Sequence, residues 1–274
     1  MPQRSVLITG CSSGIGLASA TVMRDRGWRV FATARKLDDL ARLQNFGLEA
    51  LPLELRDPAS VAACAKTALE RTDGKLSAIF NNAAYGQPGA VEDLTAELLR
   101  DQFEVNFFSW HALTRPILVA MRQQGHGRIV NCSSVLGLIS PPYRGAYNAS
   151  KFALEALTEA MRHELYGTDI HVSLIEPGPI ATRFVAHALE NLRANIDMAG
   201  SPHREVYKRR LAAMEAGGTQ RFKLPPEAVA RKLVHALESP RPKAHYYVTI
   251  PTYLAAIGKR VLPRWLGDRF VRGA

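Results

Sequence analysis

The sequence predicts an α/β fold in which a doubly wound, seven-stranded and mostly parallel sheet carries helices on both faces. Seven short apolar runs alternate with helical stretches, as crossover connections between parallel strands require. These runs lie at Val6, Val30, Leu51, Ile79, Ile129, Val172 and Val248. No break in composition divides the 274 residues, and a hydrophobic content of 47% suffices for a sizeable core, so we expect one domain over residues 1–274.

A glycine-rich turn follows the first of these strands. The order is an apolar run, then Gly10, Gly14 and Gly16, then an amphipathic helix and a second strand. Gly10 permits a tight turn, Gly14 a close approach of the backbone to a pyrophosphate, and Gly16 the packing of helix on strand. The helix N-terminus adds N–H groups and a partial positive charge. We therefore expect a dinucleotide phosphate site; the alternative is a glycine turn without a ligand.

The end of the second strand distinguishes NAD from NADP. NAD-specific sites place a carboxylate there for the ribose 2′-hydroxyl, whereas an arginine accommodates the 2′-phosphate of NADP. Here Arg35 and Lys36 follow the strand, and no carboxylate does. A guanidinium binds phosphate through two parallel bonds, so we expect Arg35 to hold it, with the hydroxyl of Ser12 or Ser13 as partner. The alternative for Arg35 is a solvated charge.

Tyr147 and Lys151 stand four residues apart in a predicted helix and therefore on one face of it. A cation a few ångström away favours the phenolate and lowers the pKa of a phenol, ordinarily about 10, by roughly 1 to 3 units. Such a tyrosine can act as an acid or base. The pair alone is a short motif that also occurs by chance, so its surroundings decide its meaning.

The order of these motifs resembles that of the short-chain dehydrogenase/reductase family over nearly the whole chain. The motifs are TGCSSGIG at residues 9–16, NNAA at 81–84, Asn106, Ser134, Tyr147 with Lys151, and Pro177–Gly178 with Thr182. TGCSSGIG and IEPGPIAT are most similar to the branch of retinol and 17β-hydroxysteroid dehydrogenases and bacterial NADP-dependent aldehyde reductases. The resemblance implies a Rossmann-type fold, an NADP(H)-dependent oxidoreductase, and a homodimer or homotetramer.

The resemblance also implies four catalytic residues. Ser134, which follows a strand and so lies at the carboxyl edge of the sheet, would hold the substrate carbonyl oxygen, and Ser133 is its nearest competitor. Tyr147 would give that oxygen a proton, and Lys151 would also bind the nicotinamide ribose. Asn106 would position a water near Lys151. From its pattern alone, Asn106 is equally well a buried amide satisfied by backbone groups.

The same resemblance implies the cofactor contacts. They are Gly10, Ser12, Ser13, Gly14, Ile15, Gly16, Arg35, Glu54, Leu55, Asn82, Ala83, Tyr147, Lys151, Pro177, Gly178, Ile180 and Thr182. Two positions depart from the family pattern. Ala84 stands where a glycine is usual and puts a methyl near the cofactor, and Glu54 stands where an aspartate usually meets the adenine amine.

The substrate pocket is expected between residues 135–143 and a lid near 183–224. The residues after Ser134 and after Thr182 offer apolar walls with few charges, which suits a lipophilic aldehyde, ketone or alcohol. We therefore expect an enzyme that interconverts a lipophilic carbonyl and its alcohol. The alternative is a catalytically silent dinucleotide-binding sensor or membrane-associated scaffold. A nucleotide-sugar epimerase is disfavoured by the length and by the missing acidic strand end.

The net positive charge lies entirely in the C-terminal part. Residues 1–200 hold 20 basic and 20 acidic side chains, and residues 201–274 hold 15 and 5. A basic helical tail is expected near 252–274, with Tyr253, Ile257 and Val261 at helical spacing and Trp265 beyond them. Such a helix is typical of a contact with anionic membrane. The simpler interpretation is packing on the pocket or on a partner subunit. No nucleic-acid-binding module is recognisable, so no nucleic-acid partner is expected.

The sequence has neither a twenty-residue apolar run nor an N-terminal signal pattern, so we expect a cytoplasmic protein, peripheral to the membrane if the tail binds it. Cys11, Cys64 and Cys132 lack C-x-x-C spacing and are expected to be reduced packing residues. The eight histidines show no metal-ligand spacing, and no metal site is expected.

Overall fold

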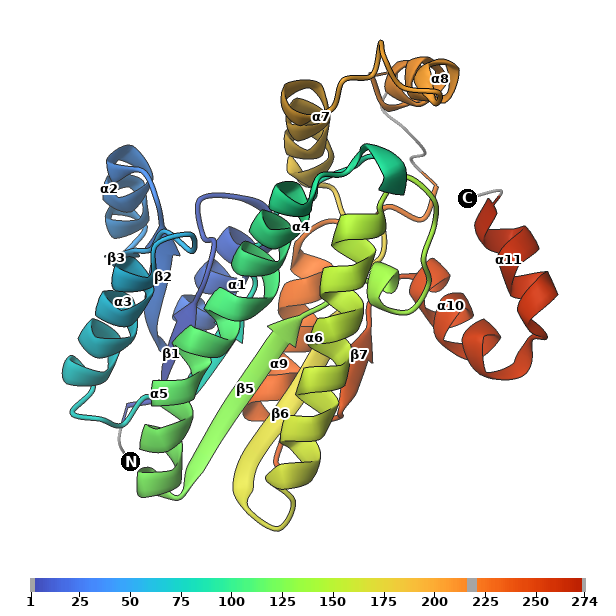
Figure 1. Cartoon of the computed structure of the whole chain (residues 1–274). Coiled ribbons are helices and arrows are strands. Elements are labelled where there is room, and N and C mark those ends of the chain that lie inside the picture. The colour runs from blue at the N-terminus through green and yellow to red at the C-terminus, as the bar shows by residue number, and fades with distance from the viewer. Residues whose placement is uncertain (1–2, 216–220, 273–274) are drawn as a thin grey trace.

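A seven-stranded sheet forms the centre of the protein in the computed structural model, which describes residues 3–215 and 221–272 (Figure 1). The strand order is β3-β2-β1-β4-β5-β6-β7, and every neighbouring pair is parallel. The strands are β1 (Ser5–Ile8), β2 (Arg29–Ala34), β3 (Glu49–Pro52), β4 (Ala78–Asn81), β5 (His126–Cys132), β6 (Asp169–Glu176) and β7 (His245–Tyr247). The predicted doubly wound fold is confirmed, with a sheet that is parallel throughout.

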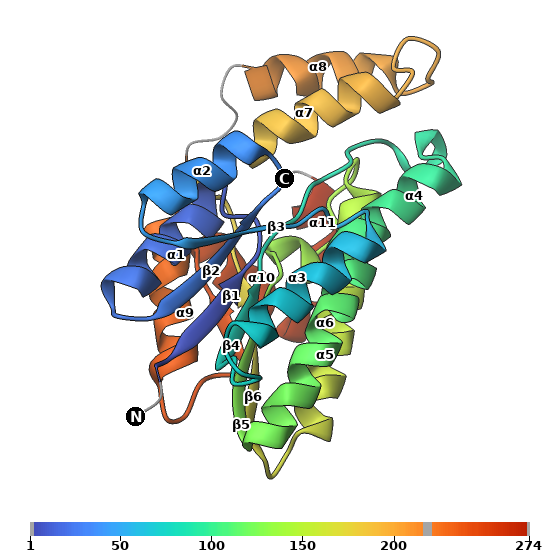
Figure 2. The same ribbon diagram turned by 90° about the vertical axis from the view of Figure 1, so that its left-hand side faces the viewer.

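Helices cover the sheet on both sides, which is why the central strands β1 and β4 are buried along their whole length. In β1 and β4 all four residues are buried. Helices α1 (Gly14–Asp25) and α9 (Glu227–Glu238) pack together on one face, and α3 (Pro58–Glu70), α5 (Ser109–Gln124) and α6 (Gly145–Glu164) cover the other (Figure 2). Two further helices are α2 (Leu37–Asn45) and α4 (Ala96–Phe103). The crossovers bring the carboxyl ends of all strands to one edge, where a ligand site is expected.

The last strand begins and ends earlier than the sequence indicates. The apolar run at Val248 lies just after β7, although the Val248 N–H still bonds the Glu176 carbonyl oxygen at 3.3 Å. Pro251 then stands in the first turn of the next helix. A proline there fits the start of a helix but has no N–H to give to a strand. The chain therefore leaves the sheet at this point.

The lid and the tail predicted from the sequence are both helical. The segment predicted to form the lid contains α7 (Phe184–Asn195) and α8 (Arg204–Glu215), which lie above the carboxyl edge of the sheet (Figure 1); residues 216–220 of this segment fall outside the described residues. The tail consists of α10 (Ile250–Val261) and α11 (Arg264–Arg272), and its last two residues also fall outside.

The three cysteines are buried and unpaired, as predicted for packing residues. Burial raises the pKa of the Cys11 and Cys64 thiols to about 12. None of the helices in residues 3–215 and 221–272 combines the length and the hydropathy needed to cross a bilayer.

Candidate active site

The glycine turn after β1 packs closely against the loop after β4. Gly10 has a φ of +73°, in the left-handed region that favours glycine. A Cβ atom at Gly10 would lie 2.8 Å from the Ala83 Cα, and one at Gly16 would lie 2.1 Å from the Gly10 carbonyl oxygen. Neither position has room for a side chain. The first turn of α1 is therefore held beside Ala83, with its N–H groups at the carboxyl edge of the sheet.

Thr9 joins these two loops. Its hydroxyl oxygen accepts hydrogen bonds from the Asn82 N–H at 2.8 Å and the Ala83 N–H at 2.9 Å. The Asn82 side chain donates in return to the Thr9 carbonyl oxygen at 2.9 Å. Sequence reasoning did not assign a role to Thr9, although a hydroxyl directly before the glycine turn was the available signal. The predicted contacts Asn82 and Ala83 thus belong to one unit with the turn.

The two serines of the turn differ in their surroundings. Ser13 is the N-cap residue of α1, but its side chain makes no capping hydrogen bond. The Ser12 carbonyl oxygen accepts a hydrogen bond from Arg42 of α2. Ile15, another predicted contact, packs against the core of the sheet. Both serines stay proposed phosphate partners.

Arg35 lies at the end of β2 with its side chain 63% exposed, 3.7 Å from the Glu54 carboxylate. An exposed ion pair of this length contributes little to stability, so the guanidinium is available to a stronger partner. Arg42 reaches the same area, because it bonds Ser12 of the glycine turn. Sequence reasoning missed Arg42, which stands two helical turns after Arg35. Two cations without a carboxylate at the strand end itself suit a 2′-phosphate.

Glu54 and Leu55 lie in the loop between β3 and α3. One Glu54 oxygen accepts a hydrogen bond from the Arg56 N–H at 3.0 Å, and the other faces Arg35. Leu55 is buried, and its carbonyl oxygen accepts from the Ser109 hydroxyl. An adenine amine at Glu54 would have to share the carboxylate with Arg35, so this contact stays a prediction.

The loop after β6 closes the other side of the glycine turn. A Cβ atom at Gly14 would lie 3.0 Å from the Thr182 methyl group. The Pro177 carbonyl oxygen accepts from the Val135 N–H at 2.8 Å, which joins this loop to the end of β5. The remaining predicted contacts, Gly178 and Ile180, lie between these two points. The structure thus brings the predicted cofactor segments together at one edge.

Tyr147 and Lys151 lie on one face of α6, as predicted, and are 9% and 1% exposed. The Lys151 Nζ donates to the Cys132 carbonyl oxygen at 2.8 Å. It lies 4.5 Å from the centre of the Trp110 ring and 5.6 Å from that of Tyr147. The end of β5 and helix α5 therefore hold the ammonium group directly behind the phenol.

Burial dominates the protonation of this pair. It raises the pKa of Tyr147 above the usual range, against the lowering effects of a hydrogen bond with Ser134 and of the Arg144 charge. Burial also lowers the pKa of Lys151 to about 8. The predicted net lowering of the Tyr147 pKa is wrong for this arrangement, because the desolvation of the phenolate outweighs the Ser134 hydrogen bond and the Arg144 charge.

The structure distinguishes Ser134 from Ser133. The Ser134 hydroxyl accepts from the Leu136 N–H at 3.1 Å and forms the hydrogen bond that acts on the Tyr147 pKa. The Ser133 hydroxyl instead lies beside Glu155, whose pKa it lowers. Ser134 is therefore the serine on the side of the phenol.

Asn106 lies in a π-helical turn, Glu104–Phe108, between α4 and α5. Its side-chain oxygen accepts from the Tyr85 N–H at 3.2 Å, and its amide donates to the Tyr85 carbonyl oxygen at 2.9 Å. The side chain thus matches the alternative of a buried amide satisfied by backbone groups. Single π-helical turns are frequent at functional sites, and the catalytic role of Asn106 stays a prediction.

A cavity that is partly open to solvent lies beside Tyr147, which forms part of its lining. The Phe184 ring of α7 lies 5.3 Å from the Tyr147 ring. The segments predicted to form the pocket contribute Leu136, Tyr143, Phe184 and Val185. Arg144 and Arg210 also line the cavity, so it carries more charge than the sequence indicated.

Hydrogen bonds hold the lid over this cavity. The Tyr207 hydroxyl of α8 donates to the Asp93 carboxylate at 2.5 Å and accepts from the Ala90 N–H at 2.7 Å. The Tyr143 hydroxyl lies 3.0 Å from the His203 Nδ1. Tyr143 has a φ of +65°, a conformation that costs a non-glycine residue on the order of 1 kcal/mol. Packing under the lid fixes this strained residue at the cavity wall.

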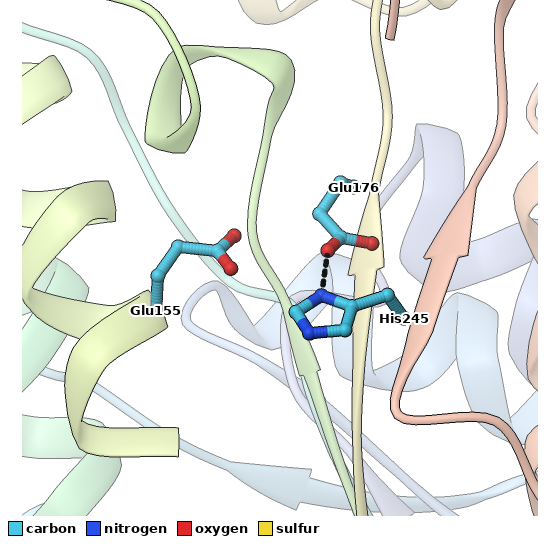
Figure 3. Close-up of side chains that lie close together, drawn as sticks. All are labelled: Glu155, Glu176 and His245. Atoms are coloured by element: carbon cyan, nitrogen blue, oxygen red, sulfur yellow. Dashed lines mark hydrogen bonds and ion pairs between the residues drawn. The ribbon is translucent and has the colours of Figure 1, made fainter. Parts of the chain in front are cut away.

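Three titratable side chains meet in the core behind Lys151. Glu155 of α6, Glu176 of β6 and His245 of β7 have ligand-type atoms within 4.8 Å of one another (Figure 3). The His245 Nδ1 lies 2.6 Å from a Glu176 oxygen, and one Glu155 oxygen has no hydrogen-bond partner among the described residues. The sequence did not indicate this group, which has the donor types of a cation site. We interpret it as a proton-sharing group, because His245 already bonds Glu176 and Lys151 supplies a cation beside Glu155.

This group makes stability depend on pH. Burial, with the Glu176 charge as the second cause, raises the pKa of Glu155 from 4.5 to about 7. Because the folded chain binds this proton more tightly, the stabilisation is complete below about pH 4.5 and is lost as the pH rises to about 7. A shift of this size corresponds to a free energy on the order of 3 kcal/mol.

We expect Glu155→Gln to remove much of that dependence. The free energy of unfolding of the variant, relative to the wild type, should rise by on the order of 3 kcal/mol between pH 5 and pH 8, measured by urea denaturation at both values. Glu159→Gln, on the same helix but exposed, is the control and should show a much smaller change. An equal difference between Glu155→Gln and wild type at both pH values would contradict the prediction.

Comparison with known proteins identifies the family. Residues 4–193 match the family model for short chain dehydrogenases. The chain belongs to the short-chain dehydrogenase/reductase family. It is 44% identical to the uncharacterized oxidoreductase YbbO of Escherichia coli (strain K12), over 99% of this chain and 95% of that one. The family predicted from the motifs is thereby confirmed, and with it an oxidoreductase.

Two further relatives place the chain within the family. It is 34% identical to human 17-beta-hydroxysteroid dehydrogenase type 1, over 91% of this chain and 78% of that one. It is 32% identical to the NADPH-dependent 3-dehydrocapnine reductase of Ornithobacterium rhinotracheale, over 97% and 95%. The predicted similarity to the hydroxysteroid dehydrogenase branch is also confirmed.

Proposed function

We propose that the protein is an NADP(H)-dependent oxidoreductase that interconverts a lipophilic aldehyde or ketone and its alcohol. The observation that carries the proposal is the position of Tyr147, whose phenol faces a largely apolar cavity with Ser134 beside it and Lys151 behind it. A substrate carbonyl in that cavity could accept hydrogen bonds from the Tyr147 and Ser134 hydroxyl groups, while the apolar wall contacts the rest of the substrate.

The proposed mechanism assigns each hydroxyl a role. Ser134 donates a hydrogen bond to the substrate carbonyl oxygen and fixes its position. Tyr147 gives that oxygen a proton on reduction and takes it back on oxidation. Tyr147 lies in the first turn of α6. The partial positive charge at the N-terminus of this helix would stabilise the phenolate that remains after proton transfer. Lys151, held by the Cys132 carbonyl oxygen, adds a fixed positive charge to the same end.

The glycine turn suits a nicotinamide dinucleotide, because its close packing holds the N–H groups at the start of α1 at the carboxyl edge of the sheet, where they can bind a pyrophosphate. When bound, NADPH supplies the hydride for the carbonyl carbon. Ser13, the N–H groups at the start of α1, and Thr182 would hold the pyrophosphate and nicotinamide side, and Arg35 with Arg42 the 2′-phosphate. The NADPH-dependent relative supports the choice of NADP(H).

A substrate panel tests the proposal. Aliphatic and aromatic aldehydes, ketones and their alcohols are offered with NADPH, NADH and the oxidised forms, and the absorbance of the reduced nicotinamide is followed. Turnover of lipophilic carbonyls with NADPH supports the proposal. Turnover confined to small polar carbonyls or sugar phosphates would contradict it, as would a lack of turnover with the whole panel.

The basic tail carries apolar side chains that stay exposed, because packing against the described part of the chain does not cover them fully. In α10 and α11 the exposed side chains are Ile250, Tyr253, Leu254, Ile257, Val261, Leu262, Trp265 and Leu266. No acidic residue occurs between Glu238 and Asp268, and Lys259 and Arg260 are exposed on the same helix. We propose that this surface makes a peripheral contact with anionic membrane, where apolar and cationic side chains act together.

Vesicle binding tests the membrane contact. The full-length protein should co-sediment with phosphatidylserine vesicles at low salt, and the variant with Lys259, Arg260 and Arg264 changed to Gln should bind more weakly by on the order of 1 kcal/mol per charge. Binding should also weaken as salt shortens the Debye length to roughly 10 Å at 0.1 M. A control with Lys66, Lys75 and Arg122 changed to Gln should bind as the wild type does. Absence of binding at low salt would instead indicate a subunit contact.

A further inference from the structure

Two arginines of the substrate cavity have no acidic partner in residues 3–215 and 221–272. Arg144 is the residue before α6, and Arg210 comes from α8 of the lid; both line the cavity with Tyr147. Among the described residues, no carboxylate lies within ion-pair distance of either guanidinium. Arginines elsewhere in the fold commonly do pair: Arg29 with Glu49 at 2.5 Å and Arg56 with Asp101 at 2.6 Å. The cavity thus holds two positive charges that no carboxylate of the described part of the chain balances.

The two charges also act on each other. Burial and the Arg210 charge lower the pKa of Arg144. Arg210 stacks on the Tyr143 ring, with 4.5 Å from its central carbon to the ring centre, and this ring is held in place by its bond to His203. Two like charges beside an apolar surface repel each other, and an anion between them would relieve this repulsion. The arrangement therefore favours the binding of an anion.

We infer that the preferred substrate carries an anionic group close to its carbonyl, and that Arg144 and Arg210 bind this group while the apolar chain fills the rest of the cavity. The inference rests on the proposed function and narrows its substrate to an acidic lipophilic carbonyl compound, with a carboxylate, sulfonate or phosphate. The carbonyl itself still binds at Tyr147 and Ser134.

The spacing of Arg144 and Tyr147 along the chain sets the distance between the anionic group and the carbonyl group of the substrate. Arg144 stands three residues before Tyr147, and residues at this spacing are neighbours on a helix surface. The charge of Arg144 acts directly on the Tyr147 phenol. An anionic group bound by Arg144 would therefore lie within a few bonds of the carbonyl. The opposite wall offers Phe184, Val185, Ala188 and Leu192 to an aliphatic chain.

A matched pair of ketones tests the inference. 4-Oxodecanoate and 4-decanone share the carbon skeleton and the carbonyl position and differ in the carboxylate. With NADPH, kcat/KM for 4-oxodecanoate should exceed that for 4-decanone by at least about tenfold, since a charge-assisted hydrogen bond contributes roughly 1.5–3 kcal/mol. The ratio of the two values should fall by about tenfold in Arg144→Gln and in Arg210→Gln. Arg144→Lys and Arg210→Lys should restore part of it, and the control Lys75→Gln should leave it unchanged.

Calorimetry separates this inference from the proposed function. The NADP⁺ complex of Tyr147→Phe is titrated with each ketone, and the carboxylate should bind at least about tenfold more tightly, with the advantage lost in the arginine variants. Tighter binding without any turnover in the wild type would contradict the proposed reductase and leave the anion site standing. Turnover of 4-decanone with no preference for 4-oxodecanoate, in rate or in binding, would overturn the inference and leave the reductase standing.

Discussion

Replacing Tyr147 with Phe should lower kcat by a factor of at least about 10², because general acid and base catalysis of this kind contributes roughly 10² to 10⁴ in rate. The substitution removes one oxygen and keeps the ring that packs against Phe184 at 5.3 Å. The fold and the cofactor site should therefore survive. The affinity for NADPH, measured by the fluorescence of the bound nicotinamide, should stay close to that of the wild type.

A second tyrosine provides the control for this experiment. Tyr166 is 94% exposed in the turn after α6, away from the cavity, so Tyr166→Phe should leave both kcat and NADPH affinity unchanged. A Tyr147→Phe enzyme with nearly the wild-type kcat, on a substrate that the wild type turns over, would exclude Tyr147 as the proton donor. A loss of NADPH binding together with activity would point to a structural role.

The sequence predicts the fold and the position of the site at the carboxyl edge of the sheet, because both depend on local patterns. A buried parallel strand reads as a continuous apolar run, and a turn that must accept a positive φ selects glycine, as at Gly10. The i, i+4 spacing of Tyr147 and Lys151 fixes their common face before any tertiary contact is known. These features can be predicted from the sequence because each involves residues that are close along the chain.

The features that were missed depend on residues brought together from distant segments. Arg210 reaches Arg144 from a lid helix more than sixty residues away in the chain, and Glu155 meets Glu176 and His245 from three separate elements. The direction of the Tyr147 pKa was misjudged for the same reason, because spacing reveals the nearby cation but not the depth of burial. Long-range packing, rather than local pattern, decides these properties.

Arg35→Asp should reverse the cofactor preference. If Arg35 of the wild type binds the 2′-phosphate, the wild type should favour NADPH. Loss of the charge-assisted pair between Arg35 and the phosphate costs roughly 1.5–3 kcal/mol, a factor of about 10 to 100 in kcat/KM for NADPH. The new carboxylate would repel the phosphate and accept a hydrogen bond from the ribose hydroxyl of NADH. Both effects act in the same direction, so the ratio of kcat/KM for NADPH over NADH should change by at least about 10².

The neighbours of Arg35 sharpen this test. Arg35 is 63% exposed and lies 3.7 Å from Glu54, so its replacement breaks only a weak surface pair, and the free energy of unfolding should change little. Arg42 bonds Ser12 in the glycine turn, and Arg42→Gln should lower the preference for NADPH less than Arg35→Asp does. Lys75→Gln, at the opposite edge of the sheet, should leave the ratio unchanged. If the wild type already prefers NADH, the cations at the end of β2 are solvated charges. If Arg35→Asp still prefers NADPH, Arg42 binds the 2′-phosphate without Arg35.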